Sequence, residues 1–216
     1  VQQLHQNDNA AGDFGQPIMN LAYGEHHVYF VASRGTEPTL NTTDGTITWG
    51  SVRDTFWKDY EVTVVSTSNG NRAVTLDRVV TKLSLAFTDA ISSDAATINF
   101  TPDTWYYGLN YKTGEPTAAT TSQTNIMTLP IGYAGRSDVS VSYFSISPST
   151  EWSTDVIVNS KEADGKIIGQ GSMTSVPLKR NRVTEYSGPL FTSGGQMSLA
   201  VLTRYAKVSD QGLTLC

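Results

Sequence analysis

The sequence predicts an all-β protein built as a β-sandwich, with at most one or two short helices. Charged residues make up only 16% of the 216 residues, below the roughly 25% usual for globular domains, and surface helices are normally rich in them. About a dozen short apolar and β-branched runs follow one another, separated by Gly, Pro, Asn, Asp and Ser. Strands at this spacing are typical of sandwiches rather than of alternating strands and helices.

The first third of the chain contains three predicted strands and one predicted helix. Residues 21–33 place aromatic and β-branched residues after a Gly turn, which indicates a buried strand. Residues 46–49 and the Val-rich residues 61–66 are two further strands. In residues 51–60 the apolar residues are spaced by four, one and three positions, which allows a short amphipathic helix capped by Ser51.

A second set of predicted strands begins with residues 73–86, of which residues 82–88 alternate strictly as in a half-buried antiparallel strand. The remaining predicted strands are 96–101, 105–111, 125–131, 139–146, 155–158, 166–168, 182–186, 197–205 and 212–215. No repeat or low-complexity linker divides the chain. Turn density, including the hairpin-type turn at residues 69–71, therefore places the domain boundary near residues 69–76. This separates an N-terminal sandwich domain, residues 1–75, from a C-terminal one, residues 76–216.

Composition excludes several classes of partner and site. The net charge is −5 and the few basic residues are scattered, so no patch suited to a phosphate backbone exists and nucleic acid is not expected as a partner. The only cysteine is Cys216, which permits neither an internal disulfide nor a paired-cysteine zinc site and is interpreted as an inert terminal thiol. No apolar run approaches the ~18 residues that a membrane span needs.

The histidines are the first candidates for acid–base chemistry or metal binding. The chain has three, His5, His26 and His27. Neighbours on a strand point to opposite faces, so His26 and His27 cannot bind one ion together, and we expect one ring inside and one on the surface. A metal or catalytic role would need a carboxylate nearby in space. Because zincin, EF-hand and nucleophile-elbow motifs are also absent from the sequence, we predict no catalytic, metal or cofactor site, and no enzyme.

Two alternatives stay open at this stage. Four tryptophans and ten tyrosines could supply a sugar-stacking platform, so a carbohydrate-binding surface module is the main alternative function. Most tryptophans of a sandwich lie in its core, and Trp57 and Trp152, flanked by charged or hydroxyl residues, are the two predicted to be exposed. A glycosidase would require two converging carboxylates beside aromatic residues, but Asp in Ser, Thr and Gly contexts usually forms turns.

Three segments carry a family resemblance. Residues 175–191, SVPLKRNRVTEYSGPLF, resemble the form V-P-L-K-R-N-x-x-T-x-x-x-G-x-L-F found near the C-terminus of fimbrillin-like proteins, the type V pilus subunits and anchors of Gram-negative anaerobes. Residues 23–32 are similar to that family's glycine-initiated strand, and residues 76–85 to the strand that opens its second domain. In the first segment we expect an exposed basic turn at Lys179 and Arg180, with Asn181 as a backbone cap.

The resemblance implies two transthyretin-like Greek-key β-sandwich domains and a non-enzymatic fimbrial or adhesion subunit. It implies export to the bacterial outer membrane as a lipoprotein, through a lipid anchor upstream of this chain. The expected partners are other fimbrial subunits and a host glycan or protein.

Assembly in this family would proceed by strand complementation, in which a sandwich lacking one strand accepts an extended segment of a neighbour. The expected donor is the C-terminal tail, with Leu213 and Leu215 alternating inward. The family's Arg-directed processing has no position fixed by the sequence, and the loop arginine Arg34 is the first candidate for it.

Overall fold

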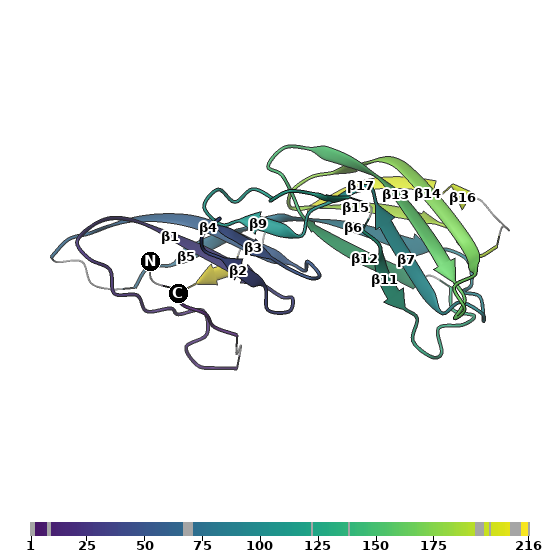
Figure 1. The fold of residues 1–216 in the computed structure, drawn as a ribbon, viewed down its shortest axis with the longest axis horizontal. Helices are drawn as coiled ribbons and strands as arrows, with labels where there is room; N and C mark the ends of the chain where they lie inside the picture. The colour runs from purple at the N-terminus through teal and green to yellow at the C-terminus, as the bar shows by residue number, and fades with distance from the viewer. Residues whose placement is uncertain are drawn as a thin grey trace.

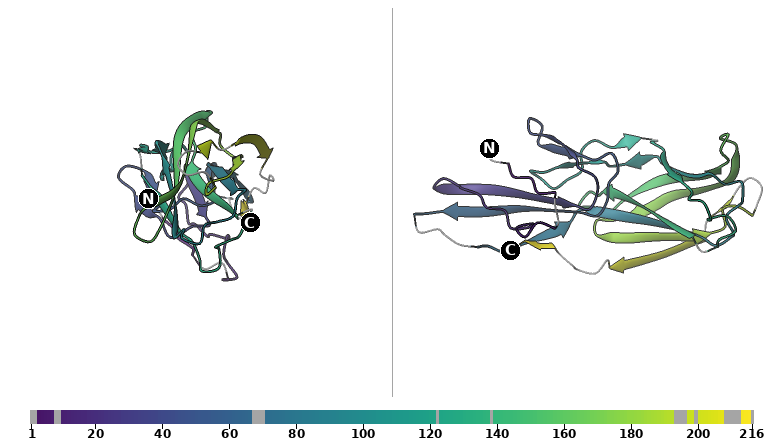
Figure 2. Two further views of the ribbon diagram at one scale, coloured as in Figure 1. Left: turned by 90° about the vertical axis from the view of Figure 1, so that its right-hand side faces the viewer. Right: turned by 90° about the horizontal axis from the view of Figure 1, so that it is seen from below.

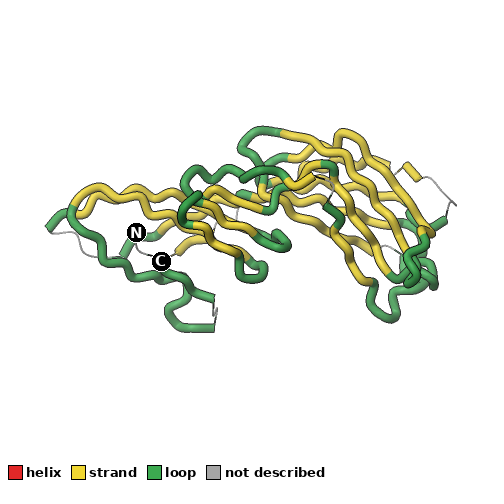
Figure 3. Tube along the Cα trace, in the orientation of Figure 1, coloured by secondary structure: helices red, strands yellow, loops and turns green. Residues whose placement is uncertain are grey.

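The computed structural model describes residues 3–7, 10–66, 71–121, 123–137, 139–192, 197–198, 200–207 and 213–215. This part of the chain consists of strands and connecting loops and contains no helix (Figure 3). The predicted all-β class is therefore confirmed. The same residues include no helical segment with the length and hydropathy of a membrane span.

One end of the molecule, called here the small end, is built on a four-stranded sheet of order β1-β4-β5-β18 (Figure 1). Its strands are β1 (Gly24–Ser33), β4 (Thr55–Val64), β5 (Val74–Arg78) and β18 (Leu213–Leu215). β1 and β4 pair antiparallel along their full length of 10 residues without a register shift. Both chain ends lie here, so the chain runs through the opposite end of the molecule and returns (Figure 2).

A second, three-stranded sheet completes the small end. It has the order β2-β3-β9, with β2 (Thr39–Asn41), β3 (Thr46–Thr48) and β9 (Gly108–Asn110). Two further short strands, β8 (Thr104–Trp105) and β10 (Thr120–Thr121), pair with each other.

The other end, called here the large end, is a sandwich of two larger sheets. One has the order β11-β7-β13-β14-β16, with β11 (Asn125–Thr128), β7 (Thr97–Pro102), β13 (Trp152–Lys161), β14 (Ile167–Leu178) and β16 (Met197–Ser198). The other has the order β12-β6-β15-β17, with β12 (Val139–Ile146), β6 (Val80–Phe87), β15 (Arg182–Gly188) and β17 (Ala200–Lys207). Most neighbours are antiparallel, whereas β6 runs parallel to β15 and β14 runs parallel to β16.

The two sheets of the large end enclose most of the main apolar core, which continues to Ile47 of β3 and Leu109 of β9 at the small end. β6 shows the predicted alternation, because Leu83, Leu85 and Phe87 are fully buried while the residues between them are half-buried. The facing sheet contributes buried residues of β7, β13 and β14 to the same cluster. Phe100 of β7 stacks on Tyr143 of β12 with ring centroids 3.9 Å apart, which ties the two layers together.

The helix predicted for residues 51–60 is wrong, because these residues lead into strand β4. Phe56, Tyr60, Val62 and Val64 lie on one face of β4, with Lys58 between the first two on the same face, and Thr and Val favour strands. Pairing with β1 on one side and β5 on the other supplies the backbone hydrogen bonds that a short isolated helix would have had to make alone. Tertiary pairing therefore decides this segment.

The domain boundary between residues 75 and 76 stays a prediction. In the structure, β5 spans residues 74–78, and only Val79 separates it from β6. Two strands that follow this point in the sequence, β9 and β18, pair with strands of the small end. The predicted turn residues Asn69 and Gly70 lie outside the described residues.

The segment that resembles fimbrillin-like proteins forms the end of β14, a tight turn and β15. Asn181 adopts a φ of 56° in this turn, and its backbone N–H donates to the carbonyl of Val80. The expected exposed basic turn is correct for Lys179 but wrong for Arg180, whose side chain is only 20% exposed. The Arg180 guanidinium donates to the carbonyls of Ser147 and Gly114, so it fastens this turn to two other loops.

Candidate functional site

The C-terminal tail meets the rest of the molecule at the edge of β5 that faces away from β4. β18 pairs antiparallel with this edge and is the last strand of the sheet. In the register, positions 213, 214 and 215 lie opposite Leu76, Thr75 and Val74. The candidate donor positions Leu213 and Leu215 thus lie opposite two buried residues of β5, but their side chains lie outside the described part of the structure.

A small apolar cluster lies on one face of this sheet. Phe56, Val74 and Leu76 are buried there, and they are flanked by the half-buried Phe30, Ala32 and Tyr60. Residues directly opposite in a ladder share a face, so positions 213 and 215 belong to the face that carries Val74 and Leu76. The cluster is much smaller than the core of the large end. A strand added at the β5 edge therefore extends a thin apolar layer.

Polar contacts anchor β5 independently of β18. Arg78, the last residue of β5, donates from Nε to Oδ1 of Asp54 at 2.6 Å and from Nη2 to Oδ2 at 3.2 Å. Its Nη1 donates to Oδ1 of Asn181 at 3.0 Å, and its guanidinium lies 4.8 Å from the ring centroid of Phe56. Charge-assisted two-point pairs of this kind fix geometry well, so the end of β5 is held in place by contacts outside the β5–β18 ladder.

The tryptophans predicted to be exposed are half-buried instead. Trp57 donates its indole N–H to the carbonyl of Tyr111 at 2.7 Å and packs against Gly114. Trp152 donates to the hydroxyl of Ser147 at 3.1 Å and meets Trp105 edge-on at 6.0 Å. Both pack against the main core, as half-buried neighbours of the fully buried tryptophans 49 and 105. Their packing contacts explain why neither ring stands free as a stacking platform.

Arg34 lies in an exposed bend immediately after β1, and its backbone N–H donates to the carbonyl of Asp54 at 3.0 Å. Its accessibility suits a processing site, and processing there stays a prediction. Of the two neighbouring histidines, His27 is exposed and His26 is half-buried. His5 lies 3.7 Å from Glu37 at the surface, and His26 and His27 are neighbours in β1, with His26 bonded to the carbonyl of Ala22.

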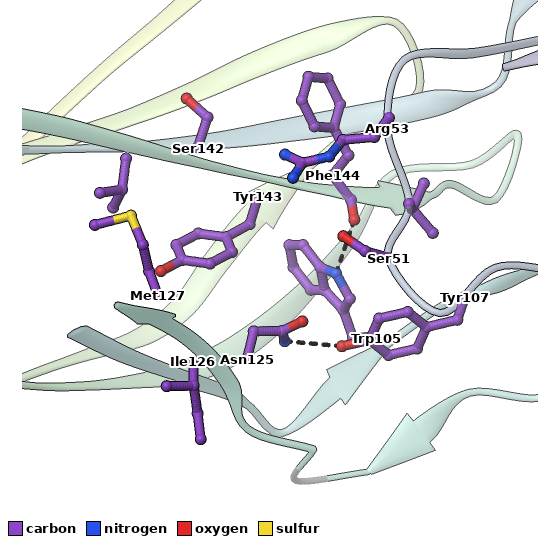
Figure 4. Close-up of a pocket in the computed structure, with 12 residues that line it drawn as sticks. Ser51, Arg53, Trp105, Tyr107, Asn125, Ile126, Met127, Ser142, Tyr143 and Phe144 are labelled. Carbon is purple, nitrogen blue, oxygen red and sulfur yellow. Dashed lines mark hydrogen bonds between the residues drawn. The ribbon is translucent and has the colours of Figure 1, made fainter. Parts of the chain in front are cut away.

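A small cavity opens between β11 and β12, the edge strands of the two sheets of the large end (Figure 4). Its volume is about 280 Å³. Trp105, Tyr107 and Tyr143 provide aromatic lining, and Asn125 donates from its amide to the Tyr107 hydroxyl at 2.8 Å. Arg53, from the connection between β3 and β4, lies at its edge. Aromatic rings with a few fixed polar groups are typical of small-ligand sites.

The hydroxyl of Tyr143 is the unusual group of this cavity. It is buried and has no hydrogen-bond partner among the described residues. Burial raises the pKa of Tyr143 to about 12, because the phenolate would lose its hydration. Burial also raises the pKa of Tyr107, an effect that the hydrogen bond from Asn125 opposes. A buried hydroxyl without a partner is uncommon in folded proteins and can mark a place for a water or a ligand.

The sequence profile described as Family of unknown function (DUF6562) matches residues 39–212. The chain belongs to the DUF6562 family. No protein of curated function matches this DUF6562 chain.

Two solved structures are similar to this DUF6562 protein. One is a putative adhesin from Bacteroides ovatus ATCC 8483, with a TM-score of 0.51 at 13% sequence identity. The match covers 72% of this chain and 66% of that chain. The other is a putative cell adhesion protein from the same strain, with a TM-score of 0.47, 16% identity and coverage of 92% and 75%. The likeness to the first structure shows a shared fold.

Two features of the DUF6562 chain were missed from its sequence. The contacts of Arg78 join residues that are 24 and 103 positions apart, and the cavity takes its lining from four separate segments. Neither leaves a local motif, because each depends on which loops the sheets bring together. The V-P-L-K-R-N segment was the only signal near the first of them, since it contains Asn181.

Proposed function

We propose that this DUF6562 protein is a non-enzymatic cell-surface adhesion subunit that joins neighbouring subunits by exchange of its C-terminal strand. The observation that carries the proposal is the position of β18, which extends the β5 edge although Leu213 lies 135 positions after Arg78, where β5 ends. The fold shared with a Bacteroides adhesin supports the adhesion role. The resemblance to fimbrillin-like proteins supports strand exchange.

Strand exchange would require no β5–β18 contact that the single subunit does not already make. β18 forms three residue pairs with β5, and the same three pairs would form if the strand came from a second copy. Since the contacts are equal, the balance between the closed monomer and the chain of subunits depends on concentration and on the connection before β18. The contacts that hold the end of β5 in place lower the conformational cost of accepting a strand from outside.

Processing at Arg34 would provide a second acceptor. β1 is the other edge of the small-end sheet and, within the described part of the chain, pairs with β4 alone. Cleavage after Arg34 would leave β1 attached by pairing with β4 and by side-chain contacts only, and its release would open the β4 edge to a neighbouring strand. In this proposal the subunit is carried to the outer membrane by an upstream lipid anchor, and its partners are other fimbrial subunits and a host glycan or protein.

A cysteine pair across the β5–β18 ladder tests strand exchange. Thr75 and Thr214 are directly opposite in the register, where Cα atoms are close enough for a disulfide. Thr75→Cys and Thr214→Cys are combined in a Cys216→Ser background, and the protein is concentrated and then oxidised. Exchange predicts disulfide-linked dimers and longer oligomers on a non-reducing gel.

The matched control places the cysteines at Glu25 and Thr63, which are opposite each other in the β1–β4 ladder. Uncleaved β1 stays within its own subunit, so this pair should yield crosslinked monomers. If the Thr75–Thr214 pair also yields monomers only at every concentration, strand exchange through β18 is wrong.

The cavity between β11 and β12 favours a second candidate function, a carbohydrate-binding surface module. Aromatic lining, the Asn125 amide and the free Tyr143 hydroxyl are groups that bind sugars. Titration with neutral and acidic monosaccharides, followed by calorimetry, tests this function. Binding that is lost on Asn125→Ala supports it, and a protein that binds none of the sugars contradicts it.

A further inference from the structure

Three potential metal ligands converge on one face of the β1–β4 ladder. His27 lies directly opposite Glu61, and Tyr29 lies directly opposite Asp59. Because side chains two positions apart on a strand share a face, Asp59 and Glu61 both lie on the face of His27. One ligand atom from each of the three side chains lies within 4.8 Å of the other two. The apolar cluster around Phe56 occupies the opposite face.

The scaffold holds these ligands in place. β1 and β4 pair over 10 residues without a bulge, so the spacing of the three backbones is set by the ladder. The His27 ring stacks on Tyr29 with centroids 6.0 Å apart and an interplanar angle of 16°. Tyr29 in turn contacts Tyr111, with centroids 5.6 Å apart. Ligands oriented by neighbouring groups lose less freedom on binding a metal.

The geometry is close to that of a zinc site. Nδ1 of His27 lies 3.0 Å from both Oδ1 and Oδ2 of Asp59. Tetrahedral zinc, with bonds of about 2.0–2.1 Å, places its ligand atoms about 3.3–3.4 Å apart. The ligand atoms of the three side chains are 3.0 Å to at most 4.8 Å apart. Small side-chain rotations bring them to the separation found around zinc.

The charges around the site also suit a cation. A neutral imidazole with two carboxylates carries two negative charges, which match a divalent ion. Glu25 lies on the same face, two residues before His27 in β1. The nearby Lys58 amino group pairs with Asp77 at 3.0 Å.

We propose that His27, Asp59 and Glu61 bind one Zn²⁺ ion on the exposed face of the small end, with water completing the coordination. One imidazole nitrogen and two carboxylates are a ligand set that zinc accepts and that magnesium, which prefers six oxygens, does not. The ion would link β1 to β4 by bonds to side chains as well as by backbone pairing. This site does not depend on the proposed adhesion function.

Calorimetric titration with ZnCl₂ alone tests the site. The protein carries Cys216→Ser, because a thiol is itself a zinc ligand, and lacks any histidine tag. We expect one bound ion per chain and an increase in the melting temperature. His27→Gln and Glu61→Gln should each weaken binding by about tenfold or more, because each removes a ligand. MgCl₂ should not bind.

His26→Gln is the matched control, since His26 is the neighbour of His27 but bonds to the carbonyl of Ala22. It should bind zinc as the parent does. The proposal is overturned if the parent does not bind zinc, or if His26→Gln and His27→Gln reduce binding equally. Circular dichroism of each variant shows whether the sheet is intact, and the exposed position of His27 favours a folded variant.

Discussion

Arg78 and Asp54 form a two-point ion pair, with Nε 2.6 Å from Oδ1 and Nη2 3.2 Å from Oδ2. Their side chains are only 11% and 17% exposed. The pair fastens the end of β5 to the connection before β4, and the bond from Arg78 to Asn181 fastens both to the turn between β14 and β15. This contact therefore links the small end to the large end.

Removing one partner of this pair should be costly. Asp54→Ala leaves the Arg78 guanidinium poorly hydrated and without its carboxylate, so we expect the free energy of unfolding to fall by about 2–3 kcal/mol. Asp77→Ala is the control, because the Lys58–Asp77 pair is 39% and 67% exposed and exposed pairs contribute about 0–1 kcal/mol. Urea unfolding measures both. Equal losses in the two variants would contradict the proposed role of the buried pair.

Position 114 requires glycine for its backbone conformation and because the Trp57 ring lies close to it. Its φ is +70°, and a Cβ there would lie 2.6 Å from atoms of the Trp57 ring. Gly114→Ala should therefore destabilise the protein by about 2–4 kcal/mol, through backbone strain and the clash. Gly132→Ala has a similar φ of +91° with no atom within 4 Å, so it should show the backbone strain alone, about 1–2 kcal/mol. If thermal unfolding shows equal destabilisation by Gly114→Ala and Gly132→Ala, the predicted clash with the Trp57 ring is wrong.

Tyr143 and Tyr107 should respond in opposite directions when their hydroxyls are removed. Tyr143→Phe deletes a buried hydroxyl without a partner and keeps the stack on Phe100, so stability should rise by about 0.5–1 kcal/mol. Tyr107→Phe deletes the acceptor of the Asn125 amide and should lower stability by about 1 kcal/mol. Urea unfolding at neutral pH measures both, and a loss in Tyr143→Phe would show that its hydroxyl does have a partner.

Tyr143 also predicts a pH dependence. Its pKa in the folded state is about 12, above the ordinary value of 10.0, so the folded state favours the neutral phenol. The contribution of Tyr143 to stability is therefore fully present below pH 10 and is lost as the pH rises towards 12. Unfolding free energies at a series of alkaline pH values should fall less steeply in Tyr143→Phe than in the parent.

Deleting residues 213–216 should separate folding from assembly. β18 contributes three residue pairs at a sheet edge, whereas β5 is held by β4 and Arg78. We expect the truncated protein to fold with a nearly unchanged melting temperature but to lose self-association, measured by analytical ultracentrifugation. The full chain with Cys216→Ser is the control for loss of the thiol. Self-association that survives the truncation would rule out the tail as donor.

Strand positions were well predicted where the signal is local. The alternation at residues 82–88 predicted β6, and the aromatic and β-branched run after Gly24 predicted β1, because a period of two directly reflects one buried face. The helix prediction for residues 51–60 was wrong for a related reason. Their spacing fits a short helix as well as a strand, and the pairing with β1 and β5 that decides between them involves residues distant in the sequence.

The candidate sites were less predictable. Trp57 and Trp152 have polar sequence neighbours, yet each contacts a residue distant in the sequence, Trp57 at Tyr111 and Trp152 at Trp105. His27 offered no motif, because its acidic neighbours come from the opposite strand at a register that only the folded ladder defines.

Composition, alternation and turn residues by themselves determined that this DUF6562 chain is all-β, because strand periodicity and turn chemistry act over a few residues. The tertiary structure alone decided which strands form edges, that β18 returns to β5, and which polar side chains meet at Arg78 and His27. Those contacts join residues from 24 to 141 positions apart, and their geometry depends on strand register, which no local pattern encodes.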